Sequence, residues 1–386
     1  MTTTPTERLR EWRQELHRYP ETGFEEHRTG DVVARVLTDL GLPFVRGVGR
    51  TGIVATLRLG DGPGAVGLRA DMDGLPLPEA NDVPYRSRHD GVMHACGHDG
   101  HMAMVLGAAA DLARDGGFDG TVHFLFQPAE EHGLGAKAML ADGLLDRFPM
   151  HAVYGLHNLP GVPAGHLATR PGPIMASEDD FEIVVTGRGG HAARPQMVVD
   201  PLVVAAEIVL ALQTIVARNV DPAQPAVVSC TELVTDGARN AIPSRVVLRG
   251  DTRSFTPDVQ ALLERRMRAL CEGICAAHGA TCTVSYTHEF EPTVNDPGCT
   301  AAAVRAAHAV VGPGRTDADC EQVLGSEDFG ALARAVPGCF TFLGTGTEPG
   351  RGGTPLHSRD YDFNDDVLEV GVRYYTELVR SLLAPR

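Results

Sequence analysis

Four histidines and a cysteine crowd into one short stretch of the sequence. His89 comes first, and the segment His94-Ala-Cys-Gly-His-Asp-Gly-His101 follows it. In an extended backbone, Cys96 and His98 would point to the same side, because side chains alternate along the chain. A thiolate and an imidazole that converge in this way suit a divalent metal ion of intermediate softness. The same sequence would also fit a buried cysteine beside histidines that cap the next helix. This segment alone therefore leaves both interpretations open.

Three other segments place metal-ligand side chains near the ends of expected strands. Glu130 and Glu131 follow a turn at Pro128, His157 lies in Gly-Leu-His-Asn, and His357 lies in Pro-Leu-His-Ser. Sites of α/β proteins form where strands end on one edge of the sheet. Adjacent carboxylates of an extended chain face opposite ways, so one could bind metal while the other faces a substrate. Taken together, these residues favour a metal site.

Asp71 and Asp73 end another expected strand, in Arg-Ala-Asp-Met-Asp-Gly. Two carboxylates on the same side of the chain could bind metal, or could accept a hydrogen bond from a ligating imidazole from behind. They could equally cap the turn before Gly74 and Pro76. The sequence does not decide between these roles.

The elements that must position these residues alternate between helix and strand in the first and last parts of the chain, which predicts an α/β domain with a largely buried sheet. The middle part reads βαββαβ, the order of small two-layer domains. We therefore expect a compact domain inserted into a larger one, with boundaries at 1–179, 180–290 and 291–386. The expected helices cover 9–16, 32–40, 102–114, 200–218, 257–278, 301–310 and 366–383, and the expected strands cover 52–59, 65–70, 121–126, 152–156, 181–186, 226–234, 245–252, 281–287 and 339–343.

Composition excludes some classes of function. The 34 basic and 50 acidic residues give a formal net charge of −16, which disfavours binding to nucleic acid or to anionic membranes. The segment Met1–Arg13 is too polar for a signal peptide, and the apolar window 201–220 reads as an amphipathic helix. Eight cysteines are too sparse for a disulfide scaffold and predict reduced thiols. These features predict a cytoplasmic protein.

One motif is set aside. Gly47-Val-Gly-Arg-Thr-Gly52 matches the dinucleotide-binding fingerprint by letters, but it precedes an expected strand instead of opening a helix. A phosphate group would meet no helix N-terminus there. We therefore interpret this segment as a turn.

Taken in order along the chain, the motifs resemble those of the two-metal amidohydrolases and aminoacylases of the metallopeptidases. The branch they are most similar to holds hippurate hydrolase, N-acyl-amino-acid amidohydrolases and indoleacetyl-amino-acid hydrolases. The resemblance runs almost from end to end. It is carried by Leu16-His-Arg-Tyr-Pro-Glu21, Arg69-Ala-Asp-Met-Asp73, His94–His101, Phe126-Gln-Pro-Ala-Glu-Glu131, Gly155-Leu-His-Asn158, Gly187-Arg-Gly-Gly-His-Ala-Ala193, Asn240-Ala-Ile-Pro243, Gly325-Ser-Glu-Asp-Phe329 and Leu356-His-Ser358.

The resemblance implies roles for individual residues. Glu130 would be the general base, and Asp73 would support the ligands from outside the metal coordination. Asp71 stands where other members have a ligating histidine, so it is not assigned as a ligand. Two divalent ions per subunit, whether manganese, zinc, cobalt or nickel, would be held by Cys96, His98, Glu131, His157 and His357.

The resemblance also implies the architecture and the substrate contacts. The fold would be a zinc-peptidase-like catalytic domain with a mixed sheet, carrying an inserted ferredoxin-like α+β domain for lid closure and dimerisation. His191, Asn240 and Arg253 match substrate-contacting positions of that inserted domain, and in relatives the histidine can reach the partner subunit's site. Gln196 departs from the histidine that relatives often have there. The subunits would form a homodimer or a homotetramer.

The expected reaction is hydrolysis of an N-acyl or N-aroyl amino acid to a carboxylic acid and a free amino acid. Glu130 would take a proton from a water activated by the two ions, and Arg253 would bind the α-carboxylate of the substrate. A dipeptidase or carboxypeptidase with the same metals is the alternative. Two further hypotheses are a thiol hydrolase with Cys96 as nucleophile and a metal-dependent binding protein without turnover.

Overall fold

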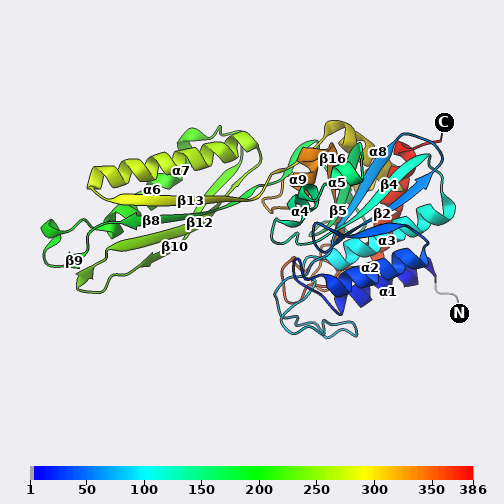
Figure 1. Ribbon diagram of the computed structural model, residues 1–386, viewed down its shortest axis with the longest axis horizontal. Coiled ribbons are helices and arrows are strands. Elements are labelled where there is room, and N and C mark those ends of the chain that lie inside the picture. The colour runs from blue at the N-terminus through cyan, green and yellow to red at the C-terminus, as the bar shows by residue number, and fades with distance from the viewer. Residues whose placement is uncertain (1–3, 386) are drawn as a thin grey trace. The chain divides into compact units, whose positions relative to one another are not determined.

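Figure 1 shows the computed structural model of the chain, which describes residues 4–385. The segment Met1–Arg13, judged above to be too polar for a signal peptide, lies within this range except for its first three residues. The chain divides into two compact units. The larger unit covers the described residues up to Ile174, Val294–Glu321 and those from Asp328 onward, and the smaller unit covers Met175–Thr293 and Gln322–Glu327.

A mixed eight-stranded sheet forms the centre of the larger unit, as the sequence predicted for an α/β domain. Its strands lie in the order β1-β2-β4-β3-β5-β16-β6-β15. Strand β3 pairs in parallel with both β4 and β5, so the carboxyl ends of these three strands meet at one edge of the sheet. The strands are β1 (Phe44–Val48), β2 (Gly52–Leu59), β3 (Ala65–Asp71), β4 (Gly120–Gln127), β5 (Ala152–Pro160), β6 (Leu167–Ala168), β15 (Thr316–Asp317) and β16 (Gly338–Gly346).

Helices pack against this sheet and bury a continuous apolar core. The amino end of α3 is buried on all sides from His98 to Ala109, so it runs through the interior and not along the surface. The core includes Leu106, Phe124, Leu343 and Tyr375. The helices are α1 (Pro5–His17), α2 (His27–Asp39), α3 (His98–Asp115), α4 (Gly135–Ala141), α5 (Leu144–Arg147), α8 (Pro297–Val311), α9 (Phe329–Ala335) and α10 (Leu368–Leu382), with the 3₁₀ turns η2 (Pro313–Arg315) and η3 (Asp365–Val367).

The smaller unit has the predicted order βαββαβ. Its four antiparallel strands lie in the order β10-β12-β8-β13, and two helices lie along one face of the sheet (Figure 1). The buried side chains between the two layers include Ile183, Ile208, Leu248 and Leu263. In chain order the elements are β8 (Glu178–Thr186), α6 (Pro201–Asn219), β10 (Ala226–Thr235), β12 (Arg245–Ser254), α7 (Pro257–His278) and β13 (Thr281–Phe290).

Several short elements were not expected from the sequence. A small ladder joins β9 (Gly190–His191) to β11 (Ala241–Ile242), and another joins β7 (Gly172–Met175) to β14 (Thr293–Asn295). The 3₁₀ turn η1 covers Pro195–Met197. The prediction also missed the short elements β1, β6, β15, α4, α5 and α9.

Two expectations from composition can be compared with the structure. Helix α6 is long and apolar enough to cross a membrane by length and composition alone. However, Val204, Ile208 and Leu212 on one face of α6 are buried in the core of the smaller unit, as in an amphipathic helix of a folded domain. All eight cysteines are free, and Cys230 and Cys282 are only half-buried.

Candidate metal centre

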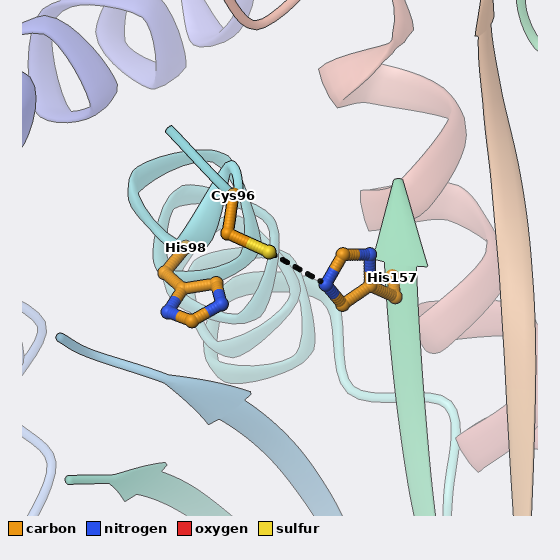
Figure 2. Close-up of side chains that lie close together, drawn as sticks. All are labelled: Cys96, His98 and His157. Atoms are coloured by element: carbon orange, nitrogen blue, oxygen red, sulfur yellow. Dashed lines mark hydrogen bonds between the residues drawn. The ribbon is translucent and has the colours of Figure 1, made fainter. Parts of the chain in front are cut away.

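The edge of the sheet where β3, β4 and β5 end in parallel gathers the ligand-type side chains. Cys96 and His98 lie at the start of α3, and His157 lies within β5, not after it as the sequence suggested. Cys96 Sγ lies 3.5 Å from His157 Nε2, and Figure 2 shows the sulfur directed at this ring with the His98 ring nearby. The three ligand atoms lie within 4.8 Å of one another.

The reason expected for the convergence of Cys96 and His98 was wrong. The chain is not extended here, because Gly97 adopts a left-handed conformation with φ 93° and His98 already begins α3. A Cβ on residue 97 would also lie 2.3 Å from Asn158 Oδ1, so only glycine fits. The sharp bend at Gly97, and not strand alternation, brings the thiol and the imidazole to the same side.

The expectation for Glu130 and Glu131 needs a similar correction. They lie in a turn that begins with Ala129 at φ 48°, so they do not face opposite ways as they would in extended chain. Glu130 Oε2 lies 3.9 Å and Glu131 Oε1 lies 3.8 Å from His98 Nε2. Both carboxylates therefore face the same imidazole nitrogen.

His357 completes a second group of ligand-type atoms. It comes from a loop eleven residues after β16, with φ 60°, and its backbone N–H donates to the Ala95 carbonyl at 2.9 Å. Its Nε2 lies 3.5 Å from Glu131 Oε2. The ligand atoms of Cys96, Glu131 and His357 lie within 4.8 Å of one another, as do those of His98, Glu130 and Glu131. Of these three groups, Cys96, His98 and Glu131 each belong to two, so the groups form one continuous cluster.

Asp73 holds this cluster from behind. Its backbone carbonyl accepts a hydrogen bond from His98 Nδ1 at 2.9 Å, so Nε2 is the candidate ligand atom. Its carboxylate accepts from the backbone N–H groups of Glu130 and Glu131, both at 3.1 Å. Asp73 is buried, so one residue fixes both the imidazole and the turn that carries the two glutamates.

The charges of the cluster suit a bound cation. Burial lowers the pKa of His98, but the charges of Asp71, Asp73 and Glu131 outweigh burial and raise the pKa to about 10. Burial and the neighbouring His101 lower the pKa of His157, so this imidazole is neutral and able to ligate. The acidic groups around His98 thus stabilise a positive charge, which a metal ion can supply in place of the proton.

Two atoms of the cluster lack hydrogen-bond partners within residues 4–385. They are His98 Nε2 and Glu131 Oε1, both fully buried. A buried polar atom without a hydrogen-bond partner costs folding free energy. Here the two atoms belong to two candidate ligands and lie 3.8 Å apart. A set of one thiolate, three imidazoles and one carboxylate that leaves such atoms unpaired fits divalent metal ions.

Behind the cluster lies a buried polar network that the sequence analysis did not assign. His101 Nδ1 contacts Asp71 Oδ1 at 2.6 Å, and its Nε2 contacts Asn158 Oδ1 at 2.6 Å. Arg69 donates to Asp71 at 2.7 Å and to Asp328 at 2.8 Å. Asp71 is therefore engaged by His101 and Arg69. Arg69 is the one member with a clear signal in the sequence, because it interrupts the apolar segment Ala65–Ala70.

A second buried network ties the ligand-bearing end of α3 to α1. His17 Nδ1 lies 2.8 Å from Asp99 Oδ2, and its Nε2 lies 3.2 Å from Glu79 Oε1. Burial lowers the pKa of His17, but the hydrogen bonds to Asp99 and Glu79 outweigh it and raise the pKa to about 9. His17 is therefore charged in the folded protein at neutral pH.

This shift predicts a loss of stability in alkali. A raised pKa contributes stability that is fully present below pH 6.5, the unfolded value, and is lost as the pH rises through 9. We expect the free energy of unfolding to fall by about 3 kcal/mol from this group between pH 6 and pH 10. Urea unfolding of the wild type and of His17→Gln at both pH values measures the difference. Equal pH dependence in the two proteins would contradict the assignment.

The three substrate-binding residues expected from the resemblance all lie in the smaller unit. His191 and Asn240 are exposed and lie near each other, because His191 pairs with Ala241 in the β9–β11 ladder. Arg253 lies on β12, where its Nη1 is 2.7 Å from Glu178 and its Nε is 2.8 Å from Asp251. The larger unit thus contains the whole cluster of candidate metal ligands, and the smaller unit contains all three candidate substrate contacts.

Comparison with known proteins places this geometry in a family. The model of peptidase family M20/M25/M40 matches residues 67–381. Thermostable carboxypeptidase 2 of Saccharolobus solfataricus is 39% identical over 96% of this chain and 93% of its own. Hippurate hydrolase of Campylobacter jejuni is 36% identical over 96% of this chain and 95% of its own.

Solved structures agree with the sequence matches. The YXEP protein of Bacillus subtilis, described as a dinuclear metal-binding peptidase of family M20, has a TM-score of 0.85 and 33% identity, and the alignment covers 98% of both chains. The resemblance drawn from the motifs is confirmed. The chain belongs to peptidase family M20/M25/M40.

Proposed function

We propose that this protein hydrolyses the amide bond of N-acyl or N-aroyl amino acids, giving a carboxylic acid and a free amino acid. The observation that carries the proposal is the arrangement around His98 Nε2, where the carboxylates of Glu130 and Glu131 lie within 4 Å of the same nitrogen. In this arrangement Glu131 would serve as a ligand while Glu130 would move protons. The relative named hippurate hydrolase supports the substrate class, since hippurate is an N-aroyl amino acid.

In this proposal the cluster holds two divalent ions, of manganese, zinc, cobalt or nickel. The unpaired atoms His98 Nε2 and Glu131 Oε1 support metal binding, and so does the dinuclear relative. When bound, the ions polarise the amide carbonyl and lower the pKa of water. The ligands would be Cys96, His98, Glu131, His157 and His357.

Glu130 is the proposed general base. Its Oε1 accepts a hydrogen bond from the backbone N–H of Asp328 at 3.4 Å, whereas its Oε2 faces His98. As general base, Glu130 would take a proton from the attacking water through Oε2 and deliver it to the leaving amide nitrogen. The carboxylate is 7% exposed, so little bulk water competes for that proton.

We further propose that the smaller unit supplies the substrate contacts. His191 would stabilise the developing oxyanion, and Asn240 would hydrogen-bond the polar backbone of the substrate. Arg253 would bind the α-carboxylate through Nη2, because its Nε and Nη1 already face Asp251 and Glu178. The smaller unit would then act as a lid on the substrate.

A homodimer or homotetramer formed through the smaller unit is part of the same proposal. On α6, the apolar side chains of Val203 and Leu210 are 57% and 72% exposed, which supports a covering partner. Light scattering of the wild type and of Leu210→Glu tests this by measuring the molecular mass of the assembly. We expect the variant to form a smaller assembly than the wild type. The free cysteines support a reducing compartment such as the cytoplasm.

A panel of substrates tests the reaction. We expect the metal-loaded protein to cleave N-acetyl and N-benzoyl amino acids faster than unblocked dipeptides. The relative named thermostable carboxypeptidase 2 favours a second candidate, a peptidase with the same centre. Faster cleavage of peptides than of N-acyl amino acids would favour that candidate and contradict the first.

A further inference from the structure

The turn that carries Glu130 and Glu131 is held in an unusual backbone conformation. It begins with Ala129 at φ 48°, a region that residues other than glycine and asparagine rarely adopt. Such a conformation persists only where the surrounding structure enforces it. The contacts that enforce it therefore decide where the two glutamates point.

Three consecutive backbone N–H groups of this turn donate to two buried carboxylates. Ala129 donates to Glu26 Oε1 at 2.8 Å, and Glu130 and Glu131 donate to Asp73 at 3.1 Å each. Both acids are almost inaccessible, Glu26 at 0% and Asp73 at 1% exposure. Asp73 was already expected to support the site, whereas no role had been assigned to Glu26.

Glu26 is itself fixed by the hairpin between β1 and β2. Thr51 donates its hydroxyl hydrogen to Glu26 Oε2 at 2.5 Å. Thr51 belongs to the segment Gly47–Gly52 that resembled a dinucleotide motif, so the structure gives that segment a different use. A Cβ at residue 52 would lie 2.9 Å from Pro128 Cδ, so the hairpin packs directly against the turn.

We infer that Glu26 is a positioning residue for the hydrolytic centre. Its carboxyl group holds the Ala129 N–H and so fixes the direction in which Glu130 and Glu131 leave the turn, and Thr51 acts through Glu26. The contact that links Glu26 to the turn is the hydrogen bond from the Ala129 backbone N–H. The inference rests on the proposed role of Glu130 as general base.

Two variants of Glu26 test the inference. In Glu26→Leu the Ala129 N–H loses its acceptor, and we expect kcat to fall by about 10- to 100-fold, as for a small misplacement of a reacting group. KM should change by less than about 3-fold, because the substrate contacts proposed for the smaller unit are untouched. Glu26→Gln keeps an oxygen that can accept from Ala129, so it should retain kcat to within about 5-fold.

Glu21→Leu is the matched control. The Glu21 carboxylate also accepts from backbone N–H groups near the start of α2, those of Arg28 and Thr29, at 3.1 and 2.8 Å. We expect this variant to lower the melting temperature and to leave kcat per folded molecule within about 2-fold. If Glu26→Leu behaves like Glu21→Leu, with stability lost and kcat kept, the inference is overturned.

Thr51→Val keeps the test decisive if Glu26→Leu does not fold. This variant removes the hydrogen bond to Glu26 with little change of shape, and we expect a fall in kcat of about 3- to 10-fold at unchanged KM. An unchanged kcat would overturn the inference. Glu130→Gln, measured beside these variants, separates the two claims: full activity of Glu130→Gln refutes the general base, whereas an inactive Glu130→Gln with normal Glu26→Leu and Thr51→Val refutes only the role of Glu26.

Discussion

Replacing Glu130 with glutamine lowers kcat by about 10²- to 10⁴-fold, the usual contribution of a general base, while the metal content per chain stays at the wild-type value. Glutamine has the same size and can still accept the Asp328 N–H through its oxygen. It cannot take a proton at the position of Oε2, which lies 3.9 Å from His98 Nε2. Steady-state kinetics and elemental analysis of the same preparation measure both quantities.

Glu131→Gln is the control for this prediction. Glu131 lies next in the chain and faces the same imidazole nitrogen, but its Oε2 also lies 3.5 Å from His357 Nε2. We expect Glu131→Gln to lose metal as well as activity, because it weakens a ligand. Metal loss from Glu130→Gln would identify Glu130 as a ligand, and near-normal kcat would remove it as the base.

Elements with clear ends were predicted well because their termini carry local signals. Helix α7 has the predicted bounds Pro257–His278: Thr256 caps its first turn, and Gly279 ends it in a left-handed conformation. In contrast, β6 and β15 have two residues each and are defined by pairing across the fold: β6 pairs with β15 and also with β16. No local pattern marks such strands.

The convergence of ligand-type side chains at one edge of the sheet was predictable, because these residues were expected near strand ends. The parallel pairing of β3 with β4 and β5 brings Asp71, Gln127 and their neighbours to one edge of the sheet. The predicted alternation of helices and strands indicated such an edge. The detailed geometry was not predictable. At Gly97 and Ala129 the chain turns through left-handed conformations, which the alternation of side chains cannot reveal.

The supporting residues were harder to predict than the candidate ligands. Glu26 contacts Ala129 across 103 positions of sequence, and Asp328 contacts Arg69 across 259 positions. A single acidic residue near a helix start reads as an ordinary cap, and only the tertiary fold shows what it holds. Residues that bind directly carry distinctive types and spacing, whereas residues that position others do not.

Replacing Cys96 with serine should weaken metal binding by at least about 100-fold, since removal of groups that merely orient ligands already costs 10- to 100-fold. Cys96 belongs to the group with His98 and His157 and to the group with Glu131 and His357. Its loss therefore affects both halves of the cluster. The loss should be greater for zinc than for manganese, because the softer ion depends more on sulfur.

Chelation distinguishes this role of Cys96 from that of a nucleophile. A thiol hydrolase would stay active after exhaustive removal of metal and would be inactivated by alkylation of Cys96. We expect the opposite: activity disappears on chelation and returns when the ion is added back. Alkylation of Cys96, located by mass spectrometry among the eight free cysteines, should be slow in the metal-loaded protein and fast after chelation, because a coordinated sulfur is not available to the reagent.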